Sequence, residues 1–271
     1  MKSPIKWVGG KKNLVPTLLP HIPKHDGYIE VFGGAGWLLF GKPLDSKWEV
    51  LNDKDKNLAN FWKVLKDTPE DFIKSFDFEI ISRTRFNEYK EQYKFHTYKN
   101  SVEQAHILYY LLKAGTGASL PDGGGCGFGR SKTCKSRLVL DKIPGDILDA
   151  HERLKSVTIE CKDYKDILTF YDTDTSFFFL DPPYRGSSRG DYASGAFTDS
   201  DYQELFTKCF NLKGKFLLTL NDDSYIFNLF NVEGFYIYPI SSFYSTSKSS
   251  KGRKQGCQLI ITNYPLSLPT K

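Results

Sequence analysis

The stretch FFFLDPPYRG at residues 177–186 joins an apolar run to an acid, two prolines and a tyrosine. The Asp181 carboxylate accepts hydrogen bonds, and Pro182 offers a carbonyl oxygen that is held in place because each proline ring restricts φ. The Tyr184 ring can stack on a planar base. We interpret Asp181, Pro182, Pro183 and Tyr184 as a clamp for the exocyclic amine of a nucleobase, adenine in particular. The same residues would also suit an ordinary turn that ends a strand.

An exocyclic amine of this kind is a poor nucleophile because its lone pair is delocalised into the ring. Two acceptors at fixed positions draw its hydrogens and let the nitrogen turn toward an electrophile. If the electrophile is a sulfonium methyl group, orientation and dipole placement carry most of the catalysis. We therefore expect neither a metal ion nor a strong base in the site.

A glycine turn follows the β-rich run in YIEVFGGAGW, and the next β-rich run ends in Asp53. Such a turn lets backbone N–H groups approach a ligand, and an acid roughly 20 residues later can accept hydrogen bonds from a ribose. No third glycine follows at position 39, which disfavours a dinucleotide and favours S-adenosylmethionine. A tight turn with a solvated acid is the alternative. KWVGGK adds a flat ring and a cation for a carboxylate, and the expected cofactor residues so far are Trp7, Lys11, Phe32, Gly33, Gly34, Gly36 and Asp53.

Apolar patterns place these motifs in alternating strands and helices, which predicts a doubly wound α/β sheet. Strands are expected at YIEVF, WEVLND, SFFFLDPPY and KFLLTLND. Between residues 68 and 150 the patterns favour helices instead, with a capping box formed by Ser101 and Gln104. A glycine-rich segment at 114–137 reads as a long loop or a weakly regular hairpin. We predict a catalytic domain formed by residues 1–67 and 151–271, interrupted by a mainly helical insert at 68–150.

Composition narrows the class of protein. The chain has 271 residues and a formal charge of +5, which permits a polyanionic partner without requiring one. Five scattered cysteines form no C-x-x-C pair, and no segment has the pattern of a signal peptide or a membrane span. We expect a cytoplasmic protein of a prokaryotic cell or a phage-infected host, with no membrane association and no obligate protein partner.

The chain resembles the Dam-type DNA adenine N6-methyltransferases in six motifs that occur in their alpha order: KWVGGK, YIEVFGGAGW, LND, DPPY, FLLTLND and QLIITN. The resemblance spans nearly the whole chain except the insert. It implies a Rossmann-like methyltransferase sheet, transfer of a methyl group from S-adenosylmethionine to adenine N6 in double-stranded DNA, and target recognition by the insert. It also implies that Asp181 touches the cofactor, that Asp163 contacts the cofactor adenine, and that residues 192–205 lie near the DNA when the base is flipped.

Two basic clusters are candidates for contacts with DNA phosphates. One follows the glycine-rich segment and the other lies in STSKSSKGRKQG; a solvated loop is the alternative for each. The expected DNA-binding residues are Arg130, Lys132, Arg137, Lys248, Arg253 and Lys254. Arg130 could present a bidentate fork to guanine. Members of the family that recognise the sequence GATC usually have an asparagine-rich, aromatic stretch in the recognition region. This chain lacks that stretch, so the GATC target cannot be assigned to it.

Two other readings stay open on the sequence. An amine methyltransferase acting on RNA, on cytosine N4 or on a protein glutamine can also use an acidic or amide residue before two prolines. A non-catalytic nucleic-acid-binding module with the same fold would be expected to have lost DPPY or the FGGAG turn, and both are intact.

Overall fold

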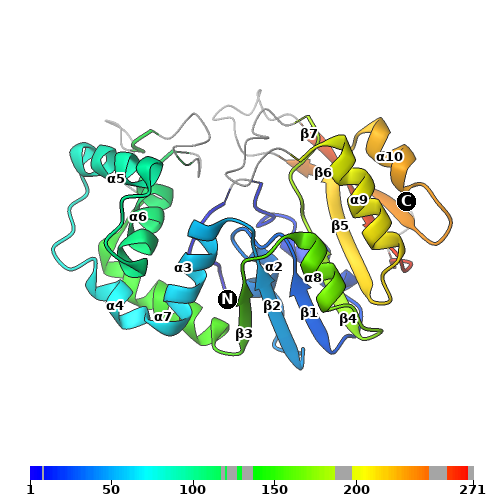
Figure 1. The fold of residues 1–271 in the computed structure, drawn as a ribbon, viewed down its shortest axis with the longest axis horizontal. Helices are drawn as coiled ribbons and strands as arrows, with labels where there is room; N and C mark the ends of the chain where they lie inside the picture. Colours follow the sequence, from blue (N-terminus) through cyan, green and yellow to red (C-terminus); the bar gives the residue numbers. More distant parts are fainter. Residues whose placement is uncertain are drawn as a thin grey trace.

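The computed structural model describes residues 1–7, 9–116, 120, 127–129, 137–186, 197–243 and 255–267. Within this part of the chain, seven strands form one sheet in the order β3–β2–β1–β4–β5–β7–β6 (Figure 1). The strands are β1 (Gly27–Glu30), β2 (Trp48–Asn52), β3 (Val157–Glu160), β4 (Ser176–Leu180), β5 (Lys215–Asn221), β6 (Tyr236–Phe243) and β7 (Gln255–Thr262). Pairing is parallel from β3 to β5, whereas β7 is antiparallel to both β5 and β6.

Helices cover both faces of this sheet, as an apolar run buried on both sides requires. Alternate residues of β4 point to opposite faces: Phe177 and Phe179 join one core cluster, and Phe178 and Leu180 join the other. The first cluster is completed by helices α1 (Val15–Leu18), α2 (Trp37–Gly41), α3 (Lys56–Asp67) and the helices of the insert, and the second by α8 (Tyr164–Phe170), α9 (Asp199–Phe210) and α10 (Ser224–Phe230). The predicted α/β class and Rossmann-like sheet are confirmed.

The described part of the segment at 68–150 is mainly helical. It contains α4 (Pro69–Lys74), α5 (Arg83–Phe95), α6 (Ser101–Ala114), a 3₁₀ turn at Leu140–Lys142 and the start of α7 (Ile143–Leu154). These helices gather beyond the β3 edge of the sheet, away from α9 and α10 (Figure 1). The predicted boundary at 150/151 falls inside α7, and the division into domains stays a prediction.

The predicted capping box of α6 is wrong by one residue. Asn100 is the N-cap, because its backbone is extended and its side chain accepts a hydrogen bond from the Glu103 N–H at 2.9 Å. The Glu103 carboxylate accepts from the Lys99 N–H at 2.6 Å, so Ser101 is already the first helical residue.

Of the glycine-rich segment at 114–137, the structure describes residues 114–116, 120, 127–129 and 137. Among these, Gly115 and Phe128 form an isolated antiparallel bridge, and the Thr116 N–H donates to the Gly127 carbonyl at 2.9 Å. Among the described helices, none is long and apolar enough to cross a membrane.

Candidate active site

The tetrapeptide 181–184 follows β4 directly, at the carboxyl end of the parallel strands. The Asp181 carboxylate accepts a hydrogen bond from the ammonium group of Lys11, with 2.7 Å to Oδ2 and 2.6 Å to Oδ1. The Thr219 hydroxyl, on the neighbouring strand β5, donates to Oδ1 at 2.8 Å. The side chains of Lys11 and Asp181 are 6% and 15% exposed, so this ion pair is largely shielded from water. Its carboxylate is therefore held in one orientation from two sides.

Opposing effects act on the acidity of Asp181. Burial raises the pKa of its carboxyl, and the Lys11 ammonium and the Thr219 hydroxyl act to lower it. The Lys11 nitrogen also lies 4.6 Å from the centroid of the Tyr184 ring and donates to the Gly9 carbonyl at 3.0 Å. A bound amine or ammonium group thus meets both a carboxylate and an aromatic face at this point.

Tyr184 and Pro183 are oriented by elements distant in the chain. The Tyr184 hydroxyl donates to the Gln258 side-chain oxygen on β7 at 3.1 Å. The Pro183 carbonyl accepts from the Tyr202 hydroxyl on α9 at 2.6 Å. Within the described residues, no hydrogen bond is made to the Pro182 carbonyl. The Pro182 carbonyl is thus left for a ligand donor, whereas the Pro183 carbonyl is occupied.

The glycine turn after β1 lies against the end of β2. The Gly34 N–H donates to Asp53 Oδ2 at 2.8 Å, and the Asp55 N–H donates to Oδ1 at 2.9 Å. Gly34 and Gly36 have φ values of 50° and 63°, which a larger side chain would strain. A β-carbon on Gly34 would also lie 3.0 Å from the Trp7 ring, so Trp7 closes over the turn. Burial raises the pKa of Asp53 to about 6.

Aromatic rings meet beside this turn. The ring centroids of Phe32 and Tyr164 are 5.5 Å apart, and Phe197 lies 6.1 Å from the first and 5.8 Å from the second. Next to Tyr164, Asp163 caps α8 through the Lys165 N–H at 3.1 Å and pairs with Lys54 at 3.0 Å. Asp163 thus lies between β3 and α8, as the N-cap of that helix. The rings form an apolar wall suited to a planar group.

The sequence-predicted residues thus meet in two adjoining groups. Lys11 lies with Asp181, and Trp7 and Asp53 lie with Gly34. The two groups adjoin because β1 and β4 are parallel neighbours, with Glu30 opposite Phe179. The segments that follow these two strands therefore leave the sheet side by side, at the carboxyl ends of the strands.

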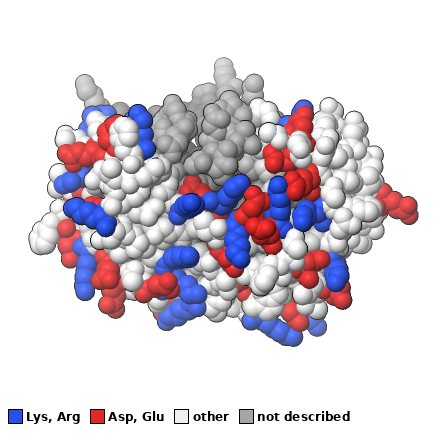
Figure 2. Space-filling view, viewed as in Figure 1, with Lys and Arg blue, Asp and Glu red and all other residues white. Residues whose placement is uncertain are grey.

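Most of the predicted DNA-binding residues lie outside the described part of the chain: Arg130, Lys132, Lys248, Arg253 and Lys254, together with residues 192–196. Arg137 is described and exposed. Burial lowers the pKa of Lys6, and the charges of Arg137 and Lys12 lower it further, so these cations lie near the opening loop. On the described surface seen in Figure 2, basic and acidic side chains are interspersed rather than gathered into one basic patch.

Several polar residues of the site were missed from the sequence: Glu30, Thr219 and Gln258. Glu30 is 2% exposed, accepts hydrogen bonds from the Leu39 N–H at 2.8 Å and the Tyr28 hydroxyl at 3.1 Å, and has a pKa that burial raises to about 8. The signal that all three share is a polar residue with an apolar neighbour on each side, in or at the end of a strand. The aromatic residues Tyr164 and Phe197 carried no such signal.

No group of three or more histidine, cysteine, aspartate and glutamate side chains within the described residues could hold a metal ion.

Comparison with known proteins gives a match over most of the chain. The model of the D12 class N6 adenine-specific DNA methyltransferase family matches residues 7–246. The chain is 26% identical to the Type II methyltransferase M1.LlaDCHI of Lactococcus lactis subsp. cremoris, over 96% of this chain and 94% of that protein. It is 27% identical to the Type II methyltransferase M.CviBI of Paramecium bursaria Chlorella virus NC1A, over 85% and 87%. The DNA adenine methylase of Escherichia coli (strain K12) is 24% identical over 66% of this chain and 64% of its own length.

Proposed function

The chain belongs to the D12 class of N6 adenine-specific DNA methyltransferases, and on that premise we propose that it uses S-adenosylmethionine to methylate a specific site in double-stranded DNA. Methylation of adenine N6 in DNA is the activity of the family. The observation that carries the proposal is the pairing of β1 with β4, which puts the glycine turn and Asp181 side by side. A methyl donor in the turn would therefore face an amine held by the tetrapeptide.

Asp181 and Pro182 are proposed to bind the target amine. The ionised Asp181 carboxylate and the Pro182 carbonyl accept the two N6 hydrogens, which frees the nitrogen lone pair to face the methyl donor. Tyr184 stacks on the base, and Pro183 restricts the backbone between them. When the N6–methyl bond has formed, the nitrogen must lose one proton, and the Asp181 carboxylate is the base in contact with it.

The cofactor residues proposed from the sequence are Trp7, Lys11, Phe32, Gly33, Gly34, Gly36, Asp53, Asp163 and Asp181. Bound S-adenosylmethionine supplies an electrophilic methyl group on a sulfonium. The donor set fits this group: Asp53 offers carboxylate oxygens for ribose hydroxyls, and the wall of Phe32, Tyr164 and Phe197 fits an adenine ring. Lys11 is paired with Asp181, so its contact with the cofactor carboxylate requires it to serve both groups.

DNA recognition is proposed for the insert at 68–150 and for the basic residues Arg130, Lys132, Arg137, Lys248, Arg253 and Lys254. The support is the charge pattern of the sequence and the position of the insert helices at one end of the sheet (Figure 1). Phosphate contacts by these residues would make affinity fall steeply with salt.

The deciding experiment incubates the purified protein with methyl-labelled S-adenosylmethionine and, separately, duplex DNA, single-stranded DNA, RNA and a protein extract. Hydrolysis then identifies the methylated species. Label is expected in N6-methyladenine from duplex DNA, and Asp181→Ala should abolish it. Asp174→Ala, an exposed acid at the opposite end of β4, is the matched control and should keep activity. Label in RNA or protein, or none with DNA, would overturn the proposal.

A further inference from the structure

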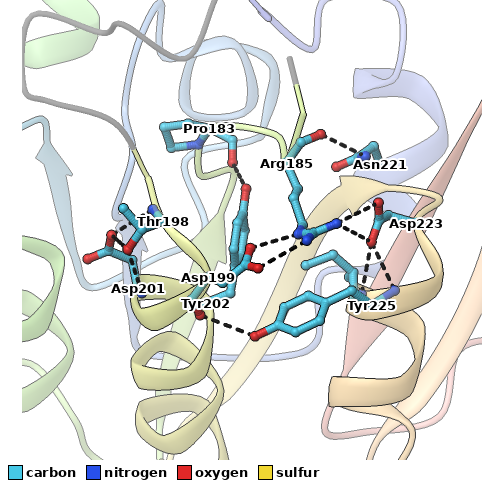
Figure 3. A network of polar contacts seen from close by, with 10 residues as sticks. Pro183, Arg185, Thr198, Asp199, Asp201, Tyr202, Asn221, Asp223 and Tyr225 are labelled. Atoms are coloured by element: carbon cyan, nitrogen blue, oxygen red, sulfur yellow. Dashed lines mark hydrogen bonds and ion pairs between the residues drawn. The ribbon is translucent and has the colours of Figure 1, made fainter. Parts of the chain in front are cut away.

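Side chains of other elements tie the loop formed by the tetrapeptide and the residue after it to the rest of the fold. The Tyr202 hydroxyl donates to the Pro183 carbonyl at 2.6 Å, and the Asn221 side-chain amide donates to the Arg185 carbonyl at 3.1 Å. The two carbonyls belong to the residues before and after Tyr184 in the chain, and Figure 3 shows both hydrogen bonds.

The Arg185 side chain ties the same loop to two further elements. Its guanidinium group makes a bidentate pair with Asp199, at 2.7 and 3.0 Å, and contacts both carboxylate oxygens of Asp223 at 3.3 and 3.4 Å. Its central carbon lies 4.6 Å from the centroid of the Tyr225 ring. Figure 3 shows both carboxylates converging on the guanidinium from opposite sides, with the Tyr225 ring against it. A planar fork held this way has little rotational freedom.

The two sets of contacts use the same structural elements. Asp199 is the first residue of α9, and Tyr202 lies one turn later in that helix. Asp223 caps α10 immediately after β5, and β5 ends with Asn221. Arg185 therefore fixes the position of the helix and the strand end that carry the two carbonyl donors. We call Tyr202, Asn221 and Arg185 the brace.

The side chain of Asn221 gives a second, independent indication that these contacts serve to hold the loop. Its side-chain oxygen is buried and has no hydrogen-bond partner, which costs stability. Its side-chain nitrogen is committed to the Arg185 carbonyl, and the reverse orientation of the amide would place two oxygens face to face. The hydrogen bond to the Arg185 carbonyl is therefore the contribution of this side chain that stands against the cost of its unpaired acceptor.

We infer that the brace positions the catalytic tetrapeptide for methyl transfer. Its hydrogen bonds occupy the Pro183 and Arg185 carbonyls, and the Pro182 carbonyl is left to accept a hydrogen from the target amine. This inference rests on the proposed function of Asp181 and Pro182. The brace residues touch neither substrate nor cofactor in this scheme, so they act through the loop. Loss of one contact lets the Pro182 carbonyl and the Tyr184 ring shift, and a shift of about 1 Å can cost on the order of 100-fold in rate.

The test uses Tyr202→Phe, which removes one hydroxyl and keeps the ring. Tyr264→Phe is the matched control: it also removes a hydroxyl that donates one hydrogen bond to a backbone carbonyl, that of His21 at 3.0 Å, and Tyr264 follows β7 at the end of the sheet opposite the tetrapeptide. The readouts are kcat for duplex DNA, KM for S-adenosylmethionine and the thermal unfolding midpoint. For Tyr202→Phe we expect kcat to fall about tenfold or more, with KM for the cofactor and the unfolding midpoint close to wild type.

Arg185 supplies a second pair of variants in case Tyr202→Phe repacks. Arg185→Met should lower kcat as strongly, and Arg185→Lys should recover part of it, because lysine keeps the charge but not the fork. The inference is overturned if kcat stays within about twofold of wild type in both Tyr202→Phe and Arg185→Met. It is also overturned if kcat falls only together with cofactor affinity and the unfolding midpoint, as a purely structural role predicts. A wild-type protein that fails to methylate DNA refutes the proposed function instead, so the two failures are distinct.

Discussion

The ammonium nitrogen of Lys11 lies 2.6 Å from Oδ1 and 2.7 Å from Oδ2 of Asp181, across 170 positions of the chain. This contact stabilises the ionised carboxylate against the effect of burial, which favours the neutral acid. An ionised Asp181 accepts hydrogen bonds with both oxygens, whereas the neutral acid would present a donor to the target amine. The first prediction follows from this pair.

Lys11→Met should shift the acid limb of the pH–rate profile to higher pH. Activity requires the ionised Asp181, so it falls as pH drops through the pKa of that carboxyl, and removal of Lys11 raises this pKa further. We expect the acid limb of kcat/KM to move to higher pH than in the wild type. Lys12→Met removes the neighbouring exposed lysine and should leave the limb in place. An unchanged acid limb in Lys11→Met would show that Lys11 does not control Asp181.

Thr219→Val removes the other donor to Asp181 without changing the shape of the side chain much. The Thr219 hydroxyl donates to Oδ1 at 2.8 Å and is fully buried. We expect single-turnover methylation to slow about tenfold, from the loss of ~1.5 kcal/mol in a hydrogen bond to a charged group. The unfolding midpoint should change little. A wild-type rate would mean that Lys11 alone orients the carboxylate.

Cofactor affinity should depend on pH through Asp53. Its pKa is about 6, and the ionised form is the one that accepts hydrogen bonds from a ribose. Below this value, the Kd for S-adenosylmethionine should rise about tenfold per pH unit, which calorimetry at several pH values measures. Asp53→Asn should weaken binding at neutral pH and flatten this dependence. A Kd that is the same at pH 5 and pH 7 would remove Asp53 from the cofactor site.

Glu30→Gln tests the buried carboxyl under the glycine turn. The folded protein holds the Glu30 proton up to about pH 8, whereas the unfolded chain releases it near 4.5. Rising pH between these values therefore destabilises the wild type relative to the variant, by ~1.4 kcal/mol per pH unit. Above pH 8 the difference should stay constant. Denaturant unfolding at several pH values measures it, and parallel curves for the two proteins would contradict the prediction.

Local patterns were sufficient to predict the strands whose ends carry the site. An apolar run that stops at glycines or prolines defines both the strand and its exit, as in β1 and β4. The expected groupings of Lys11, Gly34, Asp53 and Asp181 then follow from the parallel sheet. The fold class could be predicted for the same reason.

The contacts that complete the site depend on strand order, which local patterns do not contain. Thr219 and Gln258 reach the tetrapeptide because β5 lies beside β4 and β7 beside β5. The helices α8 and α10 were not predicted, since seven residues are too few for a clear helical period.

The place of β7 between β5 and β6 has a consequence for synthesis. β7 is the last of the described strands along the chain, yet it fills an interior slot of the sheet. Until residues 255–262 leave the ribosome, the nascent β5 presents an apolar strand edge with unpaired backbone groups. Such an edge pairs readily with other chains. Rapid overproduction should therefore send part of the protein into aggregates, and slower translation or a chaperone that covers strand edges should recover it.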